Sequence, residues 1–184
     1  MKATGIVRRI DDLGRVVIPK EIRRTLKIRE GDPLEIFVDR DGEVILKKYS
    51  PIGELGDFAQ EYADSLYEAM GHIACIADRD TVIAVSGAPK KEFMNRTLSM
   101  AVDKVMENRK SVLIHDTSQH EYYRDADEDS VSKFYAEVIA PIISEGDPIG
   151  AVIMGTRNHE AKLGDLELKL AETAAGFLAK QMEQ

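Results

Sequence analysis

The first thirty residues are rich in guanidinium and ammonium groups. The segment from Lys2 to Arg29 holds nine Lys or Arg against three Asp or Glu, a balance of +6 in a chain whose formal net charge is −8. Arg presents a planar fork of N–H donors that fits phosphate oxygens or the edge of a guanine. Phosphate contacts of this kind make binding strongly salt-dependent. The sequence therefore predicts that this basic segment is a DNA-contact surface.

The remainder of the 184-residue chain is acidic. Residues 1–50 carry twelve basic and nine acidic side chains, a balance of +3, whereas residues 51–184 carry thirteen and twenty-four, a balance of −11. Such asymmetry predicts a small basic contact module joined to a larger acidic domain. Ser50, Pro51 and Gly53 mark the boundary, so we expect domains at 1–50 and 51–184.

Apolar patterning predicts four short strands and one helix for residues 1–50. The expected strands cover residues 6–10, 15–18, 34–38 and 44–47, and the helix begins at Pro19. Between the last two strands, Asp41-Gly42 is a strong hairpin signal because Gly adopts positive φ without steric cost.

These strands carry apolar residues on both faces. Leu34 and Ile36 share one face while Phe37 lies on the other, so both faces need covering. A unit of about 50 residues buries too little surface to be stable alone. The expected solution is a second copy of the chain with interleaved strands, which predicts an obligate homodimer.

Residues 51–184 show an alternation of helices and strands. We expect, in order, a helix at 54–70, strands at 73–77 and 81–86, a helix at 91–108, a strand at 111–115, a hairpin at 137–144 and 149–156, and a helix at 163–182. This order predicts an antiparallel sheet covered by helices, so the whole chain is placed in the α+β class.

The last helix carries two apolar stripes. Leu166, Leu170 and Phe177 belong to one stripe, and an Ala-rich second stripe includes Ala171 and Ala175. A helix that covers one sheet needs a single stripe. We therefore expect subunit association through this helix and the 54–70 helix, with the Ala-rich stripe allowing close approach. The alternative is one wide stripe that faces the domain's own core.

Several ordered strings in residues 1–50 carry a family resemblance. They are Thr-Gly-Ile-Val-Arg-Arg at 4–9, Leu-Gly-Arg-Val-Val-Ile-Pro at 13–19, Glu-Ile-Arg-Arg-Thr-Leu at 21–26, Gly-Asp-Pro-Leu-Glu-Ile at 31–36 and Ile-Leu-Lys-Lys-Tyr at 45–49. Together they resemble the AbrB family of bacterial transition-state regulators. The resemblance implies a swapped-hairpin β-barrel dimer that binds double-stranded DNA and regulates transcription.

The resemblance also implies which side chains face DNA. The residues that match the family's DNA-contacting arginines are Arg8, Arg15, Arg23 and Arg24. Arg9 and Lys20 are additional candidates. On a regular strand, Arg9 would point away from Arg8, because neighbouring strand residues face opposite sides.

The element order of residues 51–184 looks like that of a GAF domain, a sensory fold. The resemblance implies a ligand pocket between the sheet and the region near residues 111–135. A small-molecule ligand of unknown identity is therefore allowed, and no cofactor is expected. Some GAF-fold proteins are methionine sulfoxide reductases, but thiol chemistry of that kind needs a resolving Cys besides the nucleophile. The single Cys75 lies in an apolar run and is expected to be a buried thiol in a reducing compartment.

No other catalytic or metal-binding pattern emerges from the sequence. There is no phosphate-binding Gly loop and no Gly-x-Ser-x-Gly elbow, so we expect no enzyme and no catalytic residue. Asp125, Asp127 and Asp129 have the spacing of a calcium loop, but Ser130 replaces its Gly and Ala136 its bidentate Glu. We expect a solvated loop there and no metal.

Together with the basic segment, the resemblance thus implies a cytoplasmic transcriptional regulator, expected to act on sporulation genes, whose partner is double-stranded DNA. We expect a homodimer through residues 1–50 and a homotetramer through the helices of the second domain. No apolar run approaches the ~18 residues that span a bilayer. The alternative is an antitoxin-like protein-interaction module of the same swapped-hairpin fold. Such modules usually continue into a disordered acidic tail, whereas residues 51–184 are patterned for structure.

Overall fold

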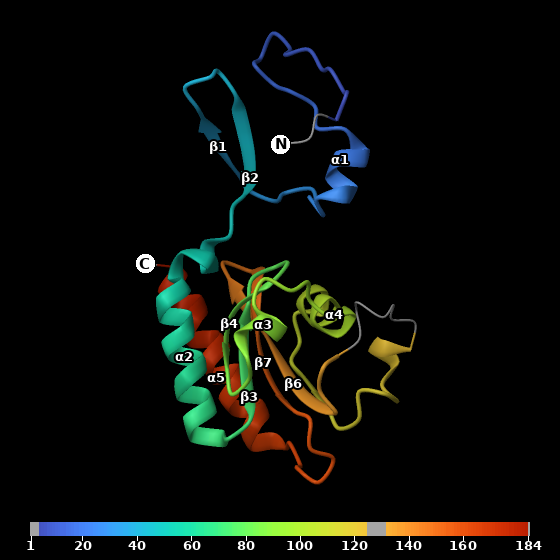
Figure 1. Ribbon diagram of the computed structural model, residues 1–184, viewed down its shortest axis with the longest axis vertical. Coiled ribbons are helices and arrows are strands. Elements are labelled where there is room, and N and C mark those ends of the chain that lie inside the picture. Colours follow the sequence, from blue (N-terminus) through green and yellow to red (C-terminus); the bar gives the residue numbers. More distant parts are fainter. Residues whose placement is uncertain (1–3, 125–131, 184) are drawn as a thin grey trace. The chain divides into compact units, whose positions relative to one another are not determined.

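The computed structural model describes residues 4–124 and 132–183. The chain divides into two compact units, Met1–Tyr49 and Ser50–Gln184, which are drawn in Figure 1. Helices and antiparallel strands occur in both units, which confirms the α+β class. Within the described ranges, no helix combines the length and apolarity that crossing a bilayer would need.

The first unit contains a short helix followed by a hairpin. Helix α1 (Lys20–Thr25) begins directly after Pro19, whose φ of −58° suits a helix start. Strands β1 (Leu34–Val38) and β2 (Val44–Lys48) pair antiparallel along their whole length, as their apolar patterning predicts.

Residues 6–10 and 15–18 are not strands, although the sequence predicts them to be. The N–H of Asp11 donates to the carbonyl of Arg15 at 3.0 Å, but beyond this bond the two arms do not join a described sheet. A strand needs a hydrogen-bonded neighbour, and the described residues of one chain offer these arms none. The expectation of four strands is therefore wrong for the single chain.

The same turn occurs twice in the first unit, at residues 11–15 and 39–43. In each, the first residue is an Asp whose carboxylate accepts the backbone N–H groups two and four residues later at 2.7–3.0 Å. The fourth residue is a Gly at positive φ, 77° at Gly14 and 82° at Gly42. Only Gly adopts this conformation freely, so both turns are fixed by their Asp and Gly residues.

The second unit is built on a five-stranded antiparallel sheet with the order β4-β3-β7-β6-β5. Its strands are β3 (Ile73–Ala77), β4 (Val82–Ser86), β5 (Val112–Ile114), β6 (Ala136–Ser144) and β7 (Asp147–Thr156). A tight turn joins β6 to β7, with φ of 51° at Glu145 and 89° at Gly146. The hairpin predicted for this part of the chain is therefore confirmed.

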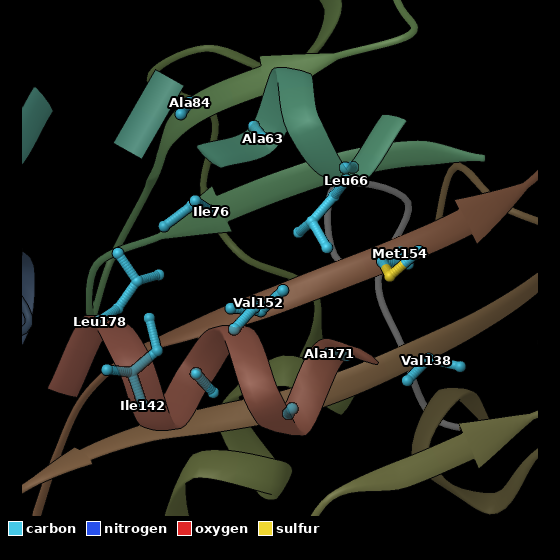
Figure 2. Close-up of a cluster of buried hydrophobic side chains, with 14 of the residues drawn as sticks. Ala63, Leu66, Ile76, Ala84, Val138, Ile142, Val152, Met154, Ala171 and Leu178 are labelled. Carbon is cyan, nitrogen blue, oxygen red and sulfur yellow. The ribbon is translucent and has the colours of Figure 1, made fainter. Parts of the chain in front are cut away.

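Helices cover both faces of this sheet (Figure 1). Helices α2 (Gly56–Met70) and α5 (Asp165–Met182) lie on one face, and α3 (Lys90–Phe93) and α4 (Met100–Asn108) lie on the other. Short 3₁₀ segments occupy Pro51–Leu55 and Glu121–Tyr123. Figure 2 shows the first face, where side chains of α2 and α5 meet those of the central strands. The core is thus two apolar layers, one on each side of the sheet.

The helix expected at 91–108 is two helices separated by an irregular segment. Asn95 has φ of 58°, and its N–H donates to the carbonyl of Val82 at 2.9 Å. Val82 in turn donates to the carbonyl of Arg96 at 3.1 Å, and Thr97 forms a bridge with Thr81. The segment therefore adds backbone pairing beside β4, and this tertiary pairing overrides the local helical pattern.

The Ala-rich stripe of α5 faces the domain's own core. Ala171, Ala175 and Leu178 are buried against the sheet, as Figure 2 shows for Ala171 and Leu178. The expectation that this stripe receives another subunit's helix is therefore wrong, because small side chains here let α5 lie close to its own β6 and β7. The other stripe remains open, with Leu166 63% and Phe177 41% exposed.

Phe177 belongs to an aromatic cluster between α5 and α2. Its ring centroid lies 5.9 Å from that of Phe58 and 5.5 Å from that of Tyr62, in stacked arrangements. Phe58 and Tyr62 are partly buried against the core. The cluster therefore continues the core to the surface of the helical face.

Candidate functional site

The six basic side chains that the sequence predicts at a DNA surface are all exposed. They are Arg8 and Arg9 before the first turn, Arg15 at its end, and Lys20, Arg23 and Arg24 on α1. The three on α1 are spaced three and four residues apart, so they share one face of the helix. Partly buried Ile22 lies away from that face. The helix therefore presents a compact group of three positive charges.

Arg8 and Arg9 lie in the unpaired arm that precedes the first turn. Because this arm is not a strand in the single chain, the alternation of a regular strand does not separate the two side chains here. Both are exposed. Their ranking as DNA contacts stays a prediction.

Arg15 is held by Asp11 across the first turn. Its Nε donates to Asp11 Oδ2 at 2.7 Å, while its backbone N–H donates to Oδ1 of the same carboxylate, also at 2.7 Å. These bonds, the backbone one foremost, lower the pKa of Asp11. The Arg15 side chain nevertheless remains 70% exposed. The turn thus aims a guanidinium group outward.

Asp11 is a site residue that sequence reasoning missed. The signal that could have found it is the repeated Asp-x-x-Gly spacing at 11–14 and 39–42, which predicts two similar turns. Only the first of these turns ends in a basic residue. In a count of charges, the Asp11 carboxylate only lowers the net positive charge of the basic segment. In the structure it orients Arg15.

A cavity of about 570 Å³ lies in the second unit, on the side of the sheet that α4 covers. Strands β3, β4, β6 and β7, residues 92–102 and residues 132–134 supply its lining. The volume is in the range of small-molecule sites. The GAF resemblance implies a pocket near residues 111–135, and among the described residues of that range only residues 132–134 line this cavity. Residues 92–102 replace the rest because the irregular segment between α3 and α4 folds over the sheet.

A carboxyl group lies in the wall of this cavity. Glu137 is 1% exposed and accepts hydrogen bonds from the Tyr123 hydroxyl at Oε1 and from Ser132 Oγ, at 2.8 Å, at Oε2. The Ser99 hydroxyl lies 3.0 Å from that of Tyr123. Burial raises the pKa of Glu137, although the two hydrogen bonds act in the opposite direction. Burial and the nearby Glu137 charge also raise the pKa of Tyr123, so the phenol keeps its proton.

Basic and aromatic groups surround the cavity elsewhere. Phe93 and Phe134 stack with ring centroids 5.5 Å apart, and Lys133 Nζ lies 5.0 Å from the Phe93 ring. Arg157 pairs with Glu92, whose carbonyl accepts a hydrogen bond from Lys133. These contacts hold the basic groups against an aromatic wall.

Cys75 also lines the cavity, and the structure confirms that it is a buried thiol. Its exposed fraction is 1%, and burial, the largest influence, raises the pKa of the thiol to about 12. At neutral pH the group is therefore a thiol and a poor nucleophile.

The calcium-like spacing of Asp125, Asp127 and Asp129 lies outside the described residues. Across the residues that are described, no three His, Cys, Asp or Glu side chains are grouped so as to hold a metal ion. The donors that could serve a ligand are therefore those of the cavity and the basic surface.

Comparison with known proteins assigns the chain to a family. The family described as "Stage V sporulation protein T C-terminal, transcription factor" matches residues 54–183. Stage V sporulation protein T of Bacillus subtilis (strain 168) is 61% identical over 184 residues, covering 100% of both chains. The chain belongs to the stage V sporulation protein T family.

Each unit of this member of the stage V sporulation protein T family has its own relatives. Residues 7–54 match the family described as "Antidote-toxin recognition MazE, bacterial antitoxin". The transition state regulatory protein AbrB of Bacillus subtilis (strain 168) is 69% identical over 51 residues, which are 28% of this chain and 52% of the relative. The resemblance of the first fifty residues to AbrB is therefore confirmed.

The second unit of this stage V sporulation protein T relative has a GAF-like fold. A solved structure of the GAF domain from an Acinetobacter phosphoenolpyruvate-protein phosphotransferase matches with a TM-score of 0.59 and 14% identity. The match covers 72% of this chain and 88% of that one. At this identity the likeness shows the fold, and it confirms the GAF-like sheet with helices predicted from the element order.

Proposed function

We propose that the chain regulates transcription of sporulation genes by binding double-stranded DNA through Arg8, Arg15, Arg23 and Arg24. The observation that carries this proposal is the set of exposed guanidinium groups in a unit that is 69% identical to AbrB over 51 residues. Arg9 and Lys20 add phosphate contacts in this proposal. The function is non-enzymatic and belongs in the cytoplasm, where the chromosome is.

The proposed DNA-binding form is a homodimer through residues 1–50. None of the described residues 4–49 is buried, and Val7, Val38 and Val17 are 87%, 74% and 71% exposed. Apolar side chains exposed at this density favour a second copy that covers them. The partner's arms would also supply the hydrogen-bonded neighbours that residues 6–10 and 15–18 lack. This dimer is the swapped-hairpin arrangement of the AbrB resemblance.

The second unit is proposed to join two such dimers into a homotetramer. Leu166 and Phe177 of α5 are exposed, and Phe177 stacks with Phe58 and Tyr62 of α2 on the same helical face. A second copy of that face is the occupant that fits it by symmetry. The cavity on the opposite face of the sheet is proposed to take a small ligand that shifts the regulator between states of different DNA affinity.

A salt series with single Arg→Ala variants tests the DNA site. Replacing Arg8, Arg15, Arg23 or Arg24 should weaken binding of operator DNA and reduce the dependence of log K on log salt, by about one unit for each phosphate that is no longer bound. Arg40→Ala is the matched control, because Arg40 is exposed in the second turn of the same unit. If all four variants keep both the affinity and the salt slope of the unaltered protein, the assigned surface is wrong.

An antitoxin-like module is the second candidate function, favoured by the MazE match at residues 7–54. It differs from the first in what residues 51–184 do. Limited proteolysis should leave a resistant C-terminal fragment if these residues form the sensor proposed above. Rapid digestion of the entire segment would favour the antitoxin-like module.

A further inference from the structure

Glu137 is a buried carboxylate whose partners among the described residues are hydroxyl groups. The Tyr123 and Ser132 hydroxyls donate to its two oxygens, and no Lys, Arg or His in the described part of the chain forms an ion pair with it. Residues 125–131 include no basic residue in their sequence. A buried carboxylate without a countercharge is costly, and such groups are normally paired.

The position of Glu137 explains how that cost can be offset. Its side chain lines the cavity, so a ligand that enters can reach the carboxylate. Strand β6 holds it there, and the network through Tyr123 to Ser99 fixes its orientation. A preorganised, uncompensated acid in a cavity wall is suited to a cationic group of a ligand.

The described remainder of the lining also includes basic and apolar side chains. Arg96 and Lys133 line the same cavity, while Phe93, Leu98 and Val102 provide apolar surface. Glu92, the other acid among the described lining residues, is already paired with Arg157. A ligand that satisfies all three regions carries an ammonium group, a small apolar body and a carboxylate.

We propose that the cavity binds a small zwitterionic amine of the α-amino-acid class, with its ammonium group on Glu137 and its carboxylate near Arg96 and Lys133. This assignment rests on the proposed ligand-sensing role of the second unit and specifies the chemistry of its ligand. Ammonium binding supplies the countercharge that the fold lacks. The apolar wall then selects among amino-acid side chains by size.

The test is calorimetric titration of the full chain with each of the twenty L-α-amino acids. At least one should bind, and at a hundredfold excess over its Kd the protein should melt about 5 °C or more higher. Glu137→Gln should weaken that binding about tenfold or more, because the ammonium group loses its charged partner. The analogue without the amino group should fail to bind the unaltered protein.

Two further variants separate binding from folding. Glu167→Gln changes the other buried Glu in the described part of the chain, which does not line the cavity, and should leave the affinity unchanged. Lys133→Met should weaken binding of the amino acid but not of the corresponding amine without its carboxylate. This second variant keeps the proposal testable if Glu137→Gln does not fold.

The proposal is overturned if none of the twenty amino acids binds, or if Glu137→Gln binds them as tightly as the unaltered protein. A parallel titration with carboxylic acids and nucleotides shows whether the amine assignment alone is wrong or whether the ligand-sensing role is wrong as well. Binding of such a compound alone would contradict the amine assignment and leave the ligand-sensing role intact. DNA binding, measured in the same preparations, reports on the basic surface independently.

Discussion

At the scale of single residues, two carboxylates have roles that their charge alone would not indicate. Asp11 closes a turn and orients Arg15, and Glu137 lines a cavity without a basic partner among the described residues. The repeated Asp-x-x-Gly spacing indicates the turn at Asp11 but not its bond to the Arg15 side chain, and no spacing signal marks Glu137. An Asp beside basic residues is typical of a solvated turn. A Glu on a strand is expected to face water unless the sheet is covered on both sides.

Asp11→Ala should reduce the discrimination of operator over non-operator DNA by about three- to tenfold, because Arg15 loses its orientation. Binding to non-operator DNA should not weaken, since an acidic group has been removed from a basic surface. Asp12→Ala is the matched control, because it removes the same charge from an exposed neighbour in the same turn. Equal discrimination in the two variants would contradict the orienting role.

The stability of the second unit should depend on the ionisation of Glu137. Burial raises the pKa of this carboxyl, so the folded protein keeps the proton at pH values where the unfolded chain has released it. Its contribution to stability is complete below the unfolded-state pKa, about 4.3, and is lost as the pH rises through the folded-state pKa.

Glu137→Gln cannot ionise and should therefore gain stability over the unaltered protein as the pH rises, on the order of 1 kcal/mol at pH 8. Urea unfolding from pH 4.5 to 8, in the absence of ligand, measures this difference. Among the titratable groups from other elements, Tyr123 and Cys75 keep their protons across this range. Glu92, Arg96 and Lys133 line the same cavity as Glu137. A difference that does not change with pH would contradict this assignment.

At the scale of secondary structure, local patterning predicted elements that complete their hydrogen bonding within the unit. The β6–β7 hairpin and helices α2 and α5 follow from apolar periodicity and turn residues. The break between α3 and α4 could not be predicted, because Asn95 adopts positive φ in order to pair with Val82. The orientation of α5 also required the structure, since either of its stripes could have faced the sheet.

Gly150 tests the close packing of the central strands. A Cβ at this position would lie 2.2 Å from the carbonyl oxygen of Ala77 on the neighbouring strand, a contact that backbone atoms cannot relieve cheaply. Gly150→Ala should lower the free energy of unfolding by about 1–3 kcal/mol. Gly56→Ala, with no neighbouring atom within 4 Å, should leave it unchanged or raise it by up to about 1 kcal/mol. Thermal or urea unfolding should thus show a loss of stability in Gly150→Ala and none in Gly56→Ala.

At the scale of the whole molecule, the two units differ in how they achieve a core. The second unit buries two apolar layers within one chain, whereas none of the described residues of the first unit is buried. The sequence predicted this difference through the two-faced strands of residues 1–50. It could not show the geometry of the arms at 6–10 and 15–18, because the described residues of this chain complete no sheet with them.

Phe177→Asp should dissociate the proposed tetramer into dimers, because a charge would replace the centre of the apolar surface on α5 and α2. Lys110→Asp is the control, since Lys110 follows α4 on the other side of the sheet. Sedimentation at several protein concentrations measures the assembly. A Phe177→Asp protein that remains tetrameric would contradict the interface.

The proposed dimer, which would cover the unburied apolar residues of the first unit, would make cellular abundance part of the regulatory mechanism. If folding of the DNA-binding arms requires a second copy, the concentration of dimer able to recognise an operator rises with the square of protomer concentration at low expression. Joining two pairs of arms through the second unit would raise the effective concentration of the arms. The dimeric arms would then form at a lower concentration of the protein. Transcription of a gene controlled by this protein would then change steeply with the concentration of the regulator. The concentration at which this change begins would depend on assembly through the helical face of the second unit.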